Sequence, residues 1–379
     1  MSKMRIAQVA PFFYPHVGGI ESHVQTLSEK LVNNGHDVTV YTSNYSDLKE
    51  SQEFHGIKVI RVKQIAELFY TPITPAIKKA VAAGSHDIVH AHTPPPLSAY
   101  YAAKACKKRK LPFVATYHCD LELPGIIGSM ATWVYKRTLG SYTFRQTERI
   151  IVHTKTYGAT SRTIWNFDVS VIPSAVNPER FGEHVDGQRI VKKHGLEGKK
   201  VVLFVGRLVS HKGLDYLIES AKSTPPEVCY LIVGSGEYLG KLKKKAREIG
   251  VKERVIFPGK VSFNDIPRYF AACNVFVLPS VSRLEAFGLV VLEAMASSKP
   301  VVISNIPGVM ELITDGREGL LAEPMNAEDL AAKINTVLSD ENKSNKMGQE
   351  GRRKVESEFS WETVVSQIEG VYTEVIGVD

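Results

Sequence analysis

The chain has 379 residues, of which 44% are hydrophobic and 23% are charged, and this composition excludes a largely disordered protein. Because one hydrophobic core rarely serves so many residues, we expect two domains of about 180 residues each. The formal net charge of +7 favours anionic ligands without identifying a partner, and nothing in the sequence indicates nucleic acid.

The first half alternates short apolar strands with helical patterns. Strands are expected at residues 5–10, 37–42, 88–92, 112–118 and 150–154, with a helix at 19–34. This alternation predicts βαβ units and a mainly parallel sheet.

A second series of strands follows, at residues 200–205, 229–233, 254–258, 275–278 and 300–303. Residues 172–188 between the two series are rich in turn formers and indicate the interdomain connection. We therefore expect an N-terminal domain at 1–183, a C-terminal domain at 184–358, and a last helix within 359–379 that packs back on the first domain. The predicted fold is α/β, with two Rossmann-like domains and mainly parallel sheets that face each other across a cleft.

No apolar run reaches the roughly 18 residues that a membrane-spanning helix needs. The four cysteines are scattered without a C-x-x-C pair, which indicates neither a zinc site nor a disulfide framework. We expect a cytoplasmic protein.

Several motifs come directly after predicted strands, at the edge where parallel sheets bind ligands. Gly18 and Gly19 open the first helix and leave backbone N–H groups accessible to a phosphate or sugar; a simple tight turn is the alternative. After the strand at 200–205, Arg207 and Lys212 supply a planar fork and a point charge that suit a diphosphate. The glycines at 234–240 nearly match a dinucleotide fingerprint, but the third glycine comes one residue late, which disfavours a nicotinamide enzyme.

Glu285 and Glu293 lie eight residues apart in a segment that runs from a strand end through Gly288 into a helix. On a continuous helix they would be about 12 Å apart, too far for a glycosidase acid/base pair. They suit a grip on two ends of one extended ligand, with a phosphate at the helix start around Phe287, Gly288, Leu289 and Val290. The alternative is an exposed loop acid and a carboxylate paired with a neighbouring cation.

Histidines also follow predicted strands. His118 ends the strand at 112–118 and could donate a hydrogen bond to a sugar hydroxyl, although a structural role is common for such a histidine. His90 and His92 lie two residues apart, but the sequence offers no third ligand that would indicate a metal site. We expect no metal and no cofactor.

Taken together, Gly18-Gly19, His118, Arg207 with Lys212, and Glu285 with Glu293 resemble the retaining nucleotide-sugar glycosyltransferases of GT-B fold, the glycogen-synthase-like family 4. The resemblance covers almost the whole chain and includes 315–321 near the last strand. It implies that Arg207 and Lys212 hold the diphosphate, that Glu293 holds the ribose and that Glu285 holds the transferred sugar. It further implies that residues 288–290 bind the distal phosphate, that Gly19 closes on the donor, and that His118 lies beside the donor sugar.

The resemblance implies transfer of a hexose from a UDP- or GDP-sugar to an acceptor hydroxyl by front-face attack, without a metal, since no two aspartates form a D-x-D pair. Two alternatives remain: a nucleotide-sugar 2-epimerase of the same architecture, which would convert the free donor, and a non-catalytic nucleotide-sugar binding protein.

The sequence does not distinguish among a small molecule, a glycan and a lipid-linked molecule as the acceptor. Residues 126–144, with Trp133, Lys136, Arg137 and the following Arg145, could contact lipid headgroups at the inner face of the membrane. A buried helix with a basic edge is the preferred interpretation of this segment.

Overall fold

A computed structural model describes residues 2–16, 18–123, 125–182 and 184–377. The chain divides into two compact units: a first unit of Met1–Ser174 with Trp361–Asp379, and a second unit of Ala175–Ser360.

The division falls earlier in the chain than residue 183, which itself lies outside the described residues. The Val176 N–H donates a hydrogen bond to the Phe359 oxygen at 3.0 Å, and Val176 and Phe181 are buried in the core of the second unit. Residues 175–182 therefore belong with the sequence that follows them, because their apolar side chains are covered there.

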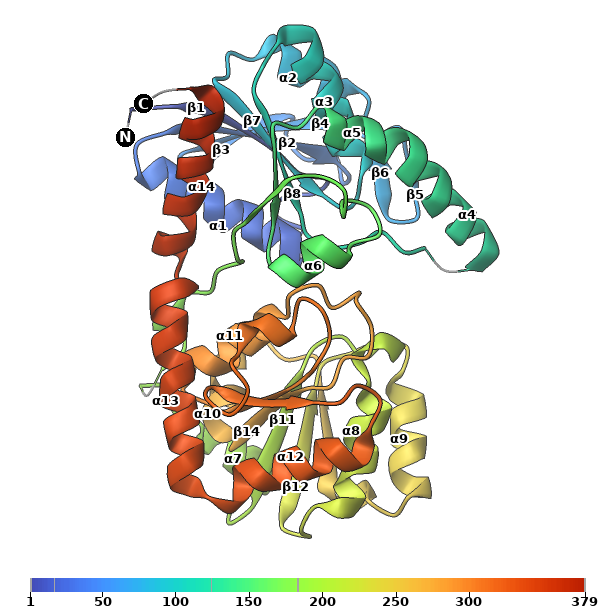
Figure 1. The fold of residues 1–379 in the computed structure, drawn as a ribbon, viewed down its shortest axis with the longest axis vertical. Helices are drawn as coiled ribbons and strands as arrows, with labels where there is room; N and C mark the ends of the chain where they lie inside the picture. Colours follow the sequence, from blue (N-terminus) through green and yellow to red (C-terminus); the bar gives the residue numbers. More distant parts are fainter. Residues whose placement is uncertain (1, 17, 124, 183, 378–379) are drawn as a thin grey trace. The chain divides into compact units, whose positions relative to one another are not determined.

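The first unit contains a sheet whose strands pair in the order β10-β9-β8-β7-β1-β2-β4-β3 (Figure 1). Its elements are β1 (Arg5–Val9), α1 (Gly19–Asn33), β2 (Asp37–Asn44), β3 (Ser51–Phe54), β4 (Ile57–Lys63), β5 (Ala66–Leu68), β6 (Thr71–Ile73), α2 (Ala76–Ala83), β7 (Ile88–Thr93), α3 (Leu97–Arg109), β8 (Phe113–Tyr117), α4 (Gly125–Tyr135), the π-helix η1 (Lys136–Gly140), α5 (Ser141–Arg145), β9 (Arg149–Val152), α6 (Lys155–Thr160), β10 (Val169–Val171) and α14 (Trp361–Ile376). All pairs in the large sheet are parallel except β3 with β4. The pattern of the sequence predicted no strand at β3 or β4.

The second unit contains a sheet in the order β13-β12-β11-β14-β15-β16, with every pair parallel. Its elements are α7 (Gln188–His194), β11 (Lys200–Val205), α8 (Leu214–Ser220), β12 (Val228–Val233), α9 (Leu239–Glu248), β13 (Val255–Gly259), α10 (Ile266–Ala272), β14 (Val275–Leu278), α11 (Leu289–Ala296), β15 (Val301–Ser304), β16 (Gly319–Ala322), α12 (Ala327–Ser339) and α13 (Glu341–Glu358), with short 3₁₀ turns at Pro178–Arg180, Ser210–Lys212, Ala221–Ser223, Lys252–Arg254 and Met310–Leu312. Strands such as β12 and β14 are buried along their whole length, which explains their continuous apolar sequence.

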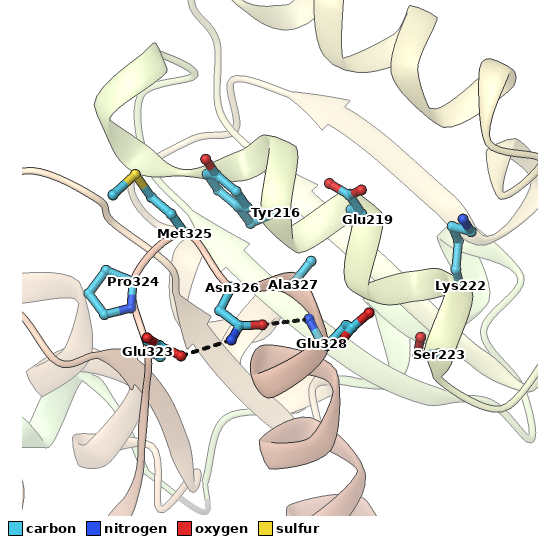
Figure 2. Close-up of a pocket in the computed structure, with 10 residues that line it drawn as sticks. All are labelled: Tyr216, Glu219, Lys222, Ser223, Glu323, Pro324, Met325, Asn326, Ala327 and Glu328. Atoms are coloured by element: carbon cyan, nitrogen blue, oxygen red, sulfur yellow. Dashed lines mark hydrogen bonds between the residues drawn. The ribbon is translucent and has the colours of Figure 1, made fainter.

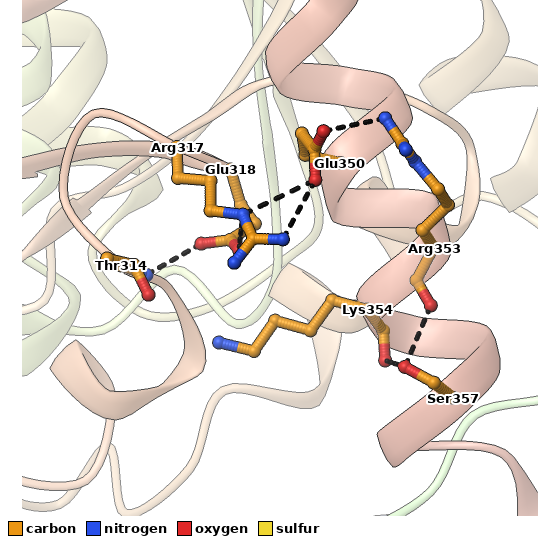
Figure 3. A network of polar contacts seen from close by, with 7 residues as sticks. All are labelled: Thr314, Arg317, Glu318, Glu350, Arg353, Lys354 and Ser357. Atoms are coloured by element: carbon orange, nitrogen blue, oxygen red, sulfur yellow. Dashed lines mark hydrogen bonds and ion pairs between the residues drawn. The ribbon is translucent and has the colours of Figure 1, made fainter.

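A polar network holds α13 on the second unit (Figure 3). Arg317 donates to Glu350 of α13 through Nε at 3.3 Å and Nη2 at 3.1 Å, and Arg353 donates to the same carboxylate at 2.6 Å. The Thr314 N–H donates to the buried Glu318 at 2.6 Å. Residues 314–318, before β16, thus hold together through their own hydrogen bond and bind α13 through Arg317.

The C-terminal helix α14 packs beside α1 in the first unit (Figure 1). The Tyr372 hydroxyl lies at the centre of a buried network: it accepts from Gln8 Nε2 at 3.0 Å and lies 2.7 Å from His90 Nδ1. His90 Nε2 in turn lies 2.7 Å from the Thr116 hydroxyl. Burial lowers the pKa of His90 to about 3, so the network is uncharged near neutral pH.

The segment at 126–144 is helical, but the expectation that it is buried is wrong for α4; the end of the segment is covered, since Thr143 and Phe144 are buried. Only Gly128 and Thr132 of α4 are buried, whereas Ile126 is 89% exposed and Ile127 72% exposed. Figure 1 shows α4 extending away from the sheet of the first unit, which leaves its apolar side chains uncovered.

Replacing Tyr372 by Phe should lower the free energy of unfolding by about 1–3 kcal/mol, because Gln8 and His90 would each lose a buried hydrogen-bond partner. Chemical denaturation of the variant measures this effect. Tyr70→Phe is the matched control, since Tyr70 is 85% exposed. Equal stability of the two variants would contradict the role of the network.

Candidate functional site

The order of strands in the second unit determines where its ligand site can lie. β11 is the first strand of the unit and pairs with β12 on one side and β14 on the other, so the order of connections reverses between β11 and β14. In open parallel sheets, ligands bind beyond the carboxyl ends of the strands at such a point. The predicted residues Arg207, Lys212 and Glu285 all lie in the two loops that leave these strands.

The two loops touch through their backbones. The Val281 N–H donates to the His211 oxygen at 2.9 Å. Gly213 has φ +66°, and a Cβ atom there would overlap the Pro279 carbonyl oxygen. Both the backbone conformation and the close approach therefore require glycine at this position.

Lys212 and Glu285 form an ion pair across the two loops. Their side chains are only 15% and 11% exposed, and Ser280 donates a further hydrogen bond to the Glu285 carboxylate at 3.0 Å. Arg207 is exposed, and no side-chain hydrogen bond to it occurs among the described residues. The two loops thus present one exposed guanidinium and an anchored pair of ammonium and carboxylate.

The helix α11 begins at this edge. Its N-cap, Gly288, has φ +83°, which explains the glycine, and the first N–H groups of the helix, at Leu289 and Val290, point out of its N-terminal end. Phe287 is 5% exposed and its ring lies 6.3 Å from that of Phe359, so its side chain belongs to the core.

Glu293 lies one turn into α11 and is partly buried. Burial raises the pKa of its carboxyl to about 7, and the charge of Arg180 opposes this shift. Arg180 stacks on Phe263, with its guanidinium carbon 3.2 Å from the ring centroid. Arg180 is therefore a neighbouring cation that acts on Glu293 through its charge, but the two form no ion pair in the described structure.

The glycines of the near-dinucleotide motif have a packing explanation. A Cβ atom on Gly234 would overlap the Gly206 carbonyl oxygen, and one on Gly236 would overlap the Leu208 carbonyl oxygen. These glycines let the loop after β12 lie directly against the loop after β11.

In the first unit, three neighbouring strands each lead to a histidine: His92 lies in β7, His118 follows β8 and His153 follows β9. His92 Nδ1 lies 3.2 Å from His118 Nε2, and His118 Nδ1 lies 3.0 Å from His153 Nε2. Burial lowers the pKa of His118 well below its usual value, and the neighbouring His153 adds to this effect.

The sequence offered no third partner for His90 and His92, and the structure adds a histidine from another part of the chain. α1 places His23 against the cluster, with its ring centroid 5.6 Å from that of His92 and 5.2 Å from that of His118. Sequence spacing could not reveal this group, because its members come from separate βα units.

Gly18 and Gly19 stand at the start of α1, as expected. Gly18 is the N-cap with an extended backbone, and a Cβ atom on Gly19 would meet nothing within 4 Å. A Cβ atom on Gly18 would overlap the Glu21 carboxylate, so local packing accounts for that glycine. The space beside Gly19 is open, which leaves room for close approach of a ligand to its backbone.

Two family models match this chain. Residues 17–180 match Glycosyltransferase Family 4, and residues 186–354 match Glycosyl transferases group 1. The fold is that of sucrose-phosphate synthase from Thermosynechococcus elongatus, with a TM-score of 0.83 at 22% identity over 100% of both chains. The chain is a GT-B glycosyltransferase. The predicted fold class, two Rossmann-like α/β domains with mainly parallel sheets, is confirmed.

Two further proteins resemble this glycosyltransferase along nearly its whole length. A GDP-mannose-dependent alpha-(1-6)-phosphatidylinositol monomannoside mannosyltransferase of Mycolicibacterium smegmatis is 28% identical over 93% of this chain and 94% of the relative. HepE of Anabaena, solved in complex with UDP-glucose, has a TM-score of 0.77 at 23% identity over 98% of this chain and 100% of that one.

A pocket of about 510 Å³ elsewhere in the glycosyltransferase shares none of the predicted residues (Figure 2). It lies between α8 and the start of α12, where Glu219, Glu323 and Glu328 line it. Asn326 accepts hydrogen bonds from the N–H groups of Glu328 and Asp329, so the start of α12 is already capped. Its acidic lining and capped helix make it unsuited to a diphosphate.

The raised pKa of Glu293 predicts a pH-dependent stability of the second unit. A carboxyl whose pKa is higher in the folded state than in the unfolded state stabilises the folded protein when it is protonated. This contribution is complete below the unfolded pKa of 4.5 and is lost as the pH rises through the folded pKa of about 7. The free energy of unfolding of Glu293→Gln, relative to that of wild type, should therefore rise from pH 5 to pH 8 by on the order of 3 kcal/mol. The difference in melting temperature at the two pH values measures it.

The control is Glu253→Gln, whose side chain is 90% exposed. A difference between wild type and Glu293→Gln that stays constant with pH would show that Glu293 is ionised throughout this range.

Proposed function

We propose that this glycosyltransferase moves a hexose from a UDP- or GDP-sugar to an acceptor hydroxyl with retention of the anomeric configuration. The observation that carries the proposal is that Arg207, the Lys212–Glu285 pair and the start of α11 all lie in the two loops that leave β11 and β14. This edge combines cations and helix N–H groups, which suit a diphosphate, with carboxylates, which suit sugar hydroxyls.

In this proposal Arg207, Lys212 and the N–H groups around residues 288–290 bind the diphosphate. Glu285 binds hydroxyls of the transferred sugar and Glu293 binds the ribose hydroxyls. Because Glu285 already fixes Lys212, the ammonium is oriented before the donor arrives. The roles that the resemblance implies for Gly18, Gly19 and His118 stay predictions.

The chemistry follows from charge. The bond between the anomeric carbon and the diphosphate oxygen breaks, the acceptor oxygen bonds to the same face of that carbon, and the acceptor proton passes to the departing diphosphate. Negative charge grows on the diphosphate during this step, and Arg207 and Lys212 stabilise it without a metal ion at that position. The products are the glycosylated acceptor and a nucleoside diphosphate.

The base of the donor is either guanine or uracil, and a different relative supports each. The Mycolicibacterium relative is named as GDP-mannose-dependent, whereas HepE was solved with UDP-glucose. A thermal-shift comparison of UDP and GDP distinguishes the two, because a ligand at 100 times its dissociation constant adds about 2.7 kcal/mol of stability.

Arg207→Ala and Lys212→Ala should each lower kcat by roughly 10²- to 10³-fold, as loss of a preorganised charge-stabilising donor does. The assay follows release of nucleoside diphosphate from the donor that the thermal shift selects. Lys252→Ala, an exposed lysine of the same unit, is the control and should keep wild-type turnover. Turnover of the two variants within a few-fold of wild type would remove both residues from this role.

The uncovered face of α4 supports peripheral contact with an anionic membrane, which fits a lipid-linked acceptor. Ile126, Ile127, Met130 and Trp133 are exposed on it, and the guanidinium of Arg137 lies 4.2 Å from the centroid of the Trp133 ring. Residues 125–145 contain three basic residues and no acidic residue, which suits negatively charged headgroups. In the described part of the chain, each helix is too short or too polar to cross a bilayer.

The protein should float with liposomes that contain anionic lipid, and added salt should weaken this binding because part of the attraction is electrostatic. Replacing Ile126 and Ile127 together by Ser should reduce the bound fraction severalfold, since both side chains are exposed and their loss removes apolar contact without opening the core. Replacement of Val171 by Ser, an exposed apolar residue of β10, is the control. Equal flotation of both variants and wild type would exclude α4 as the contact.

A further inference from the structure

We propose that the β5–β6 hairpin places its tip in the headgroup region of a membrane and so forms a second lipid contact in addition to that of α4. This inference rests on the peripheral membrane contact proposed above and identifies a further element that makes it. The hairpin consists of β5 (Ala66–Leu68) and β6 (Thr71–Ile73), and Phe69 and Tyr70 form the loop between them.

The two loop residues are unusual for their backbone conformation. Phe69 has φ +49° and Tyr70 has φ +58°, and Leu68 pairs with Thr71 across the loop. A two-residue hairpin loop with two positive φ angles is a type I′ turn, in which Asn and Gly are the preferred residues. Bulky side chains rarely adopt such angles and are strained there. The turn itself therefore does not account for two aromatic residues at this position.

Packing does not account for them either. The large apolar side chains of the hairpin are open to solvent: Ile65 is 65% exposed, Leu68 58%, Phe69 39% and Tyr70 85%. In β6, by contrast, Thr71 and Pro72 are buried, and this strand packs against α3. One strand thus holds the hairpin on the first unit, while the other strand and the tip present apolar surface to an external partner.

The topology relates the hairpin to α4. β4 and β8 run parallel to the strands between them, and the hairpin follows the carboxyl end of β4 as α4 follows that of β8. Both elements therefore leave the same edge of the sheet, and four strand spacings of about 4.8 Å separate the two strand ends by roughly 19 Å. In Figure 1 the hairpin and α4 lie on the same side of this unit. One flat lipid surface could contact both.

The composition of the hairpin favours a lipid surface over a charged partner. Residues 64–73 contain a single charged residue, Glu67. Aromatic side chains with a polar end, such as Tyr70, prefer the boundary between headgroups and acyl chains. The basic residues of 125–145 supply attraction to anionic headgroups, whereas the hairpin supplies apolar contact that does not depend on charge. The two contacts should therefore differ in their response to salt.

Replacing Phe69 by Asn and Tyr70 by Gly together tests the hairpin. Because these residues suit the type I′ turn, the melting temperature should stay unchanged or rise. The double variant should float severalfold less than wild type with vesicles of phosphatidylcholine and phosphatidylglycerol. The deficit should persist in 1 M salt, where the Debye length falls to about 3 Å and electrostatic attraction is screened.

Trp165→Ser is the matched control, since Trp165 is 66% exposed and lies before the amino end of β10, away from this edge of the sheet. It should float like wild type. If wild type itself does not float, the peripheral contact fails and this inference fails with it.

Two results would overturn the hairpin contact alone. One is a double variant that floats like wild type when the variant with Ser at 126 and 127 floats less. The other is sedimentation, without vesicles, of wild type as a dimer and of the double variant as a monomer, which would show that a second copy of the chain covers the tip.

Discussion

The pairing of β11 with β14 is the constraint on which the candidate site depends. Val202 faces Val275 and Leu203 faces Phe276 in parallel register, so the two strands end at the same edge although more than sixty residues separate them. That pairing brings the loop with Lys212 against the loop with Glu285. The glycine at 213 then permits backbone contact, and the ion pair forms where neither loop alone could provide it.

The first unit uses the same principle with a different chemistry. β7, β8 and β9 are neighbours in a parallel sheet, and the histidines at their ends converge because the strands end together. Burial keeps these imidazoles uncharged, so a group of like residues can pack without electrostatic repulsion. A parallel sheet thereby gathers cations at one edge of one unit and neutral imidazoles at one edge of the other.

Local sequence predicted the strands well where burial on both faces makes them continuously apolar, as in β11 and β14. It missed the hairpin of β3 and β4: β3 is a short, polar, half-exposed edge strand, and β4 beside it alternates buried apolar residues with charged ones. It also misjudged α4, because an apolar helical pattern does not reveal whether another element covers it. For the same reason, His23 could be joined to His92 and His118 only by three-dimensional contacts between βα units.

The Lys212–Glu285 pair illustrates why a charged site can persist without its ligand. Removing two charges from water is costly, and the pair is largely buried, so its attraction must be supported by further hydrogen bonds. Ser280 supplies one of these to Glu285. Among the described residues, the Lys212 ammonium donates a side-chain hydrogen bond to Glu285 alone. It therefore keeps N–H groups that a phosphate oxygen can use. The pair therefore fixes the position of the cation without consuming all of its hydrogen bonds, which is the condition that preorganised stabilisation of a leaving group requires.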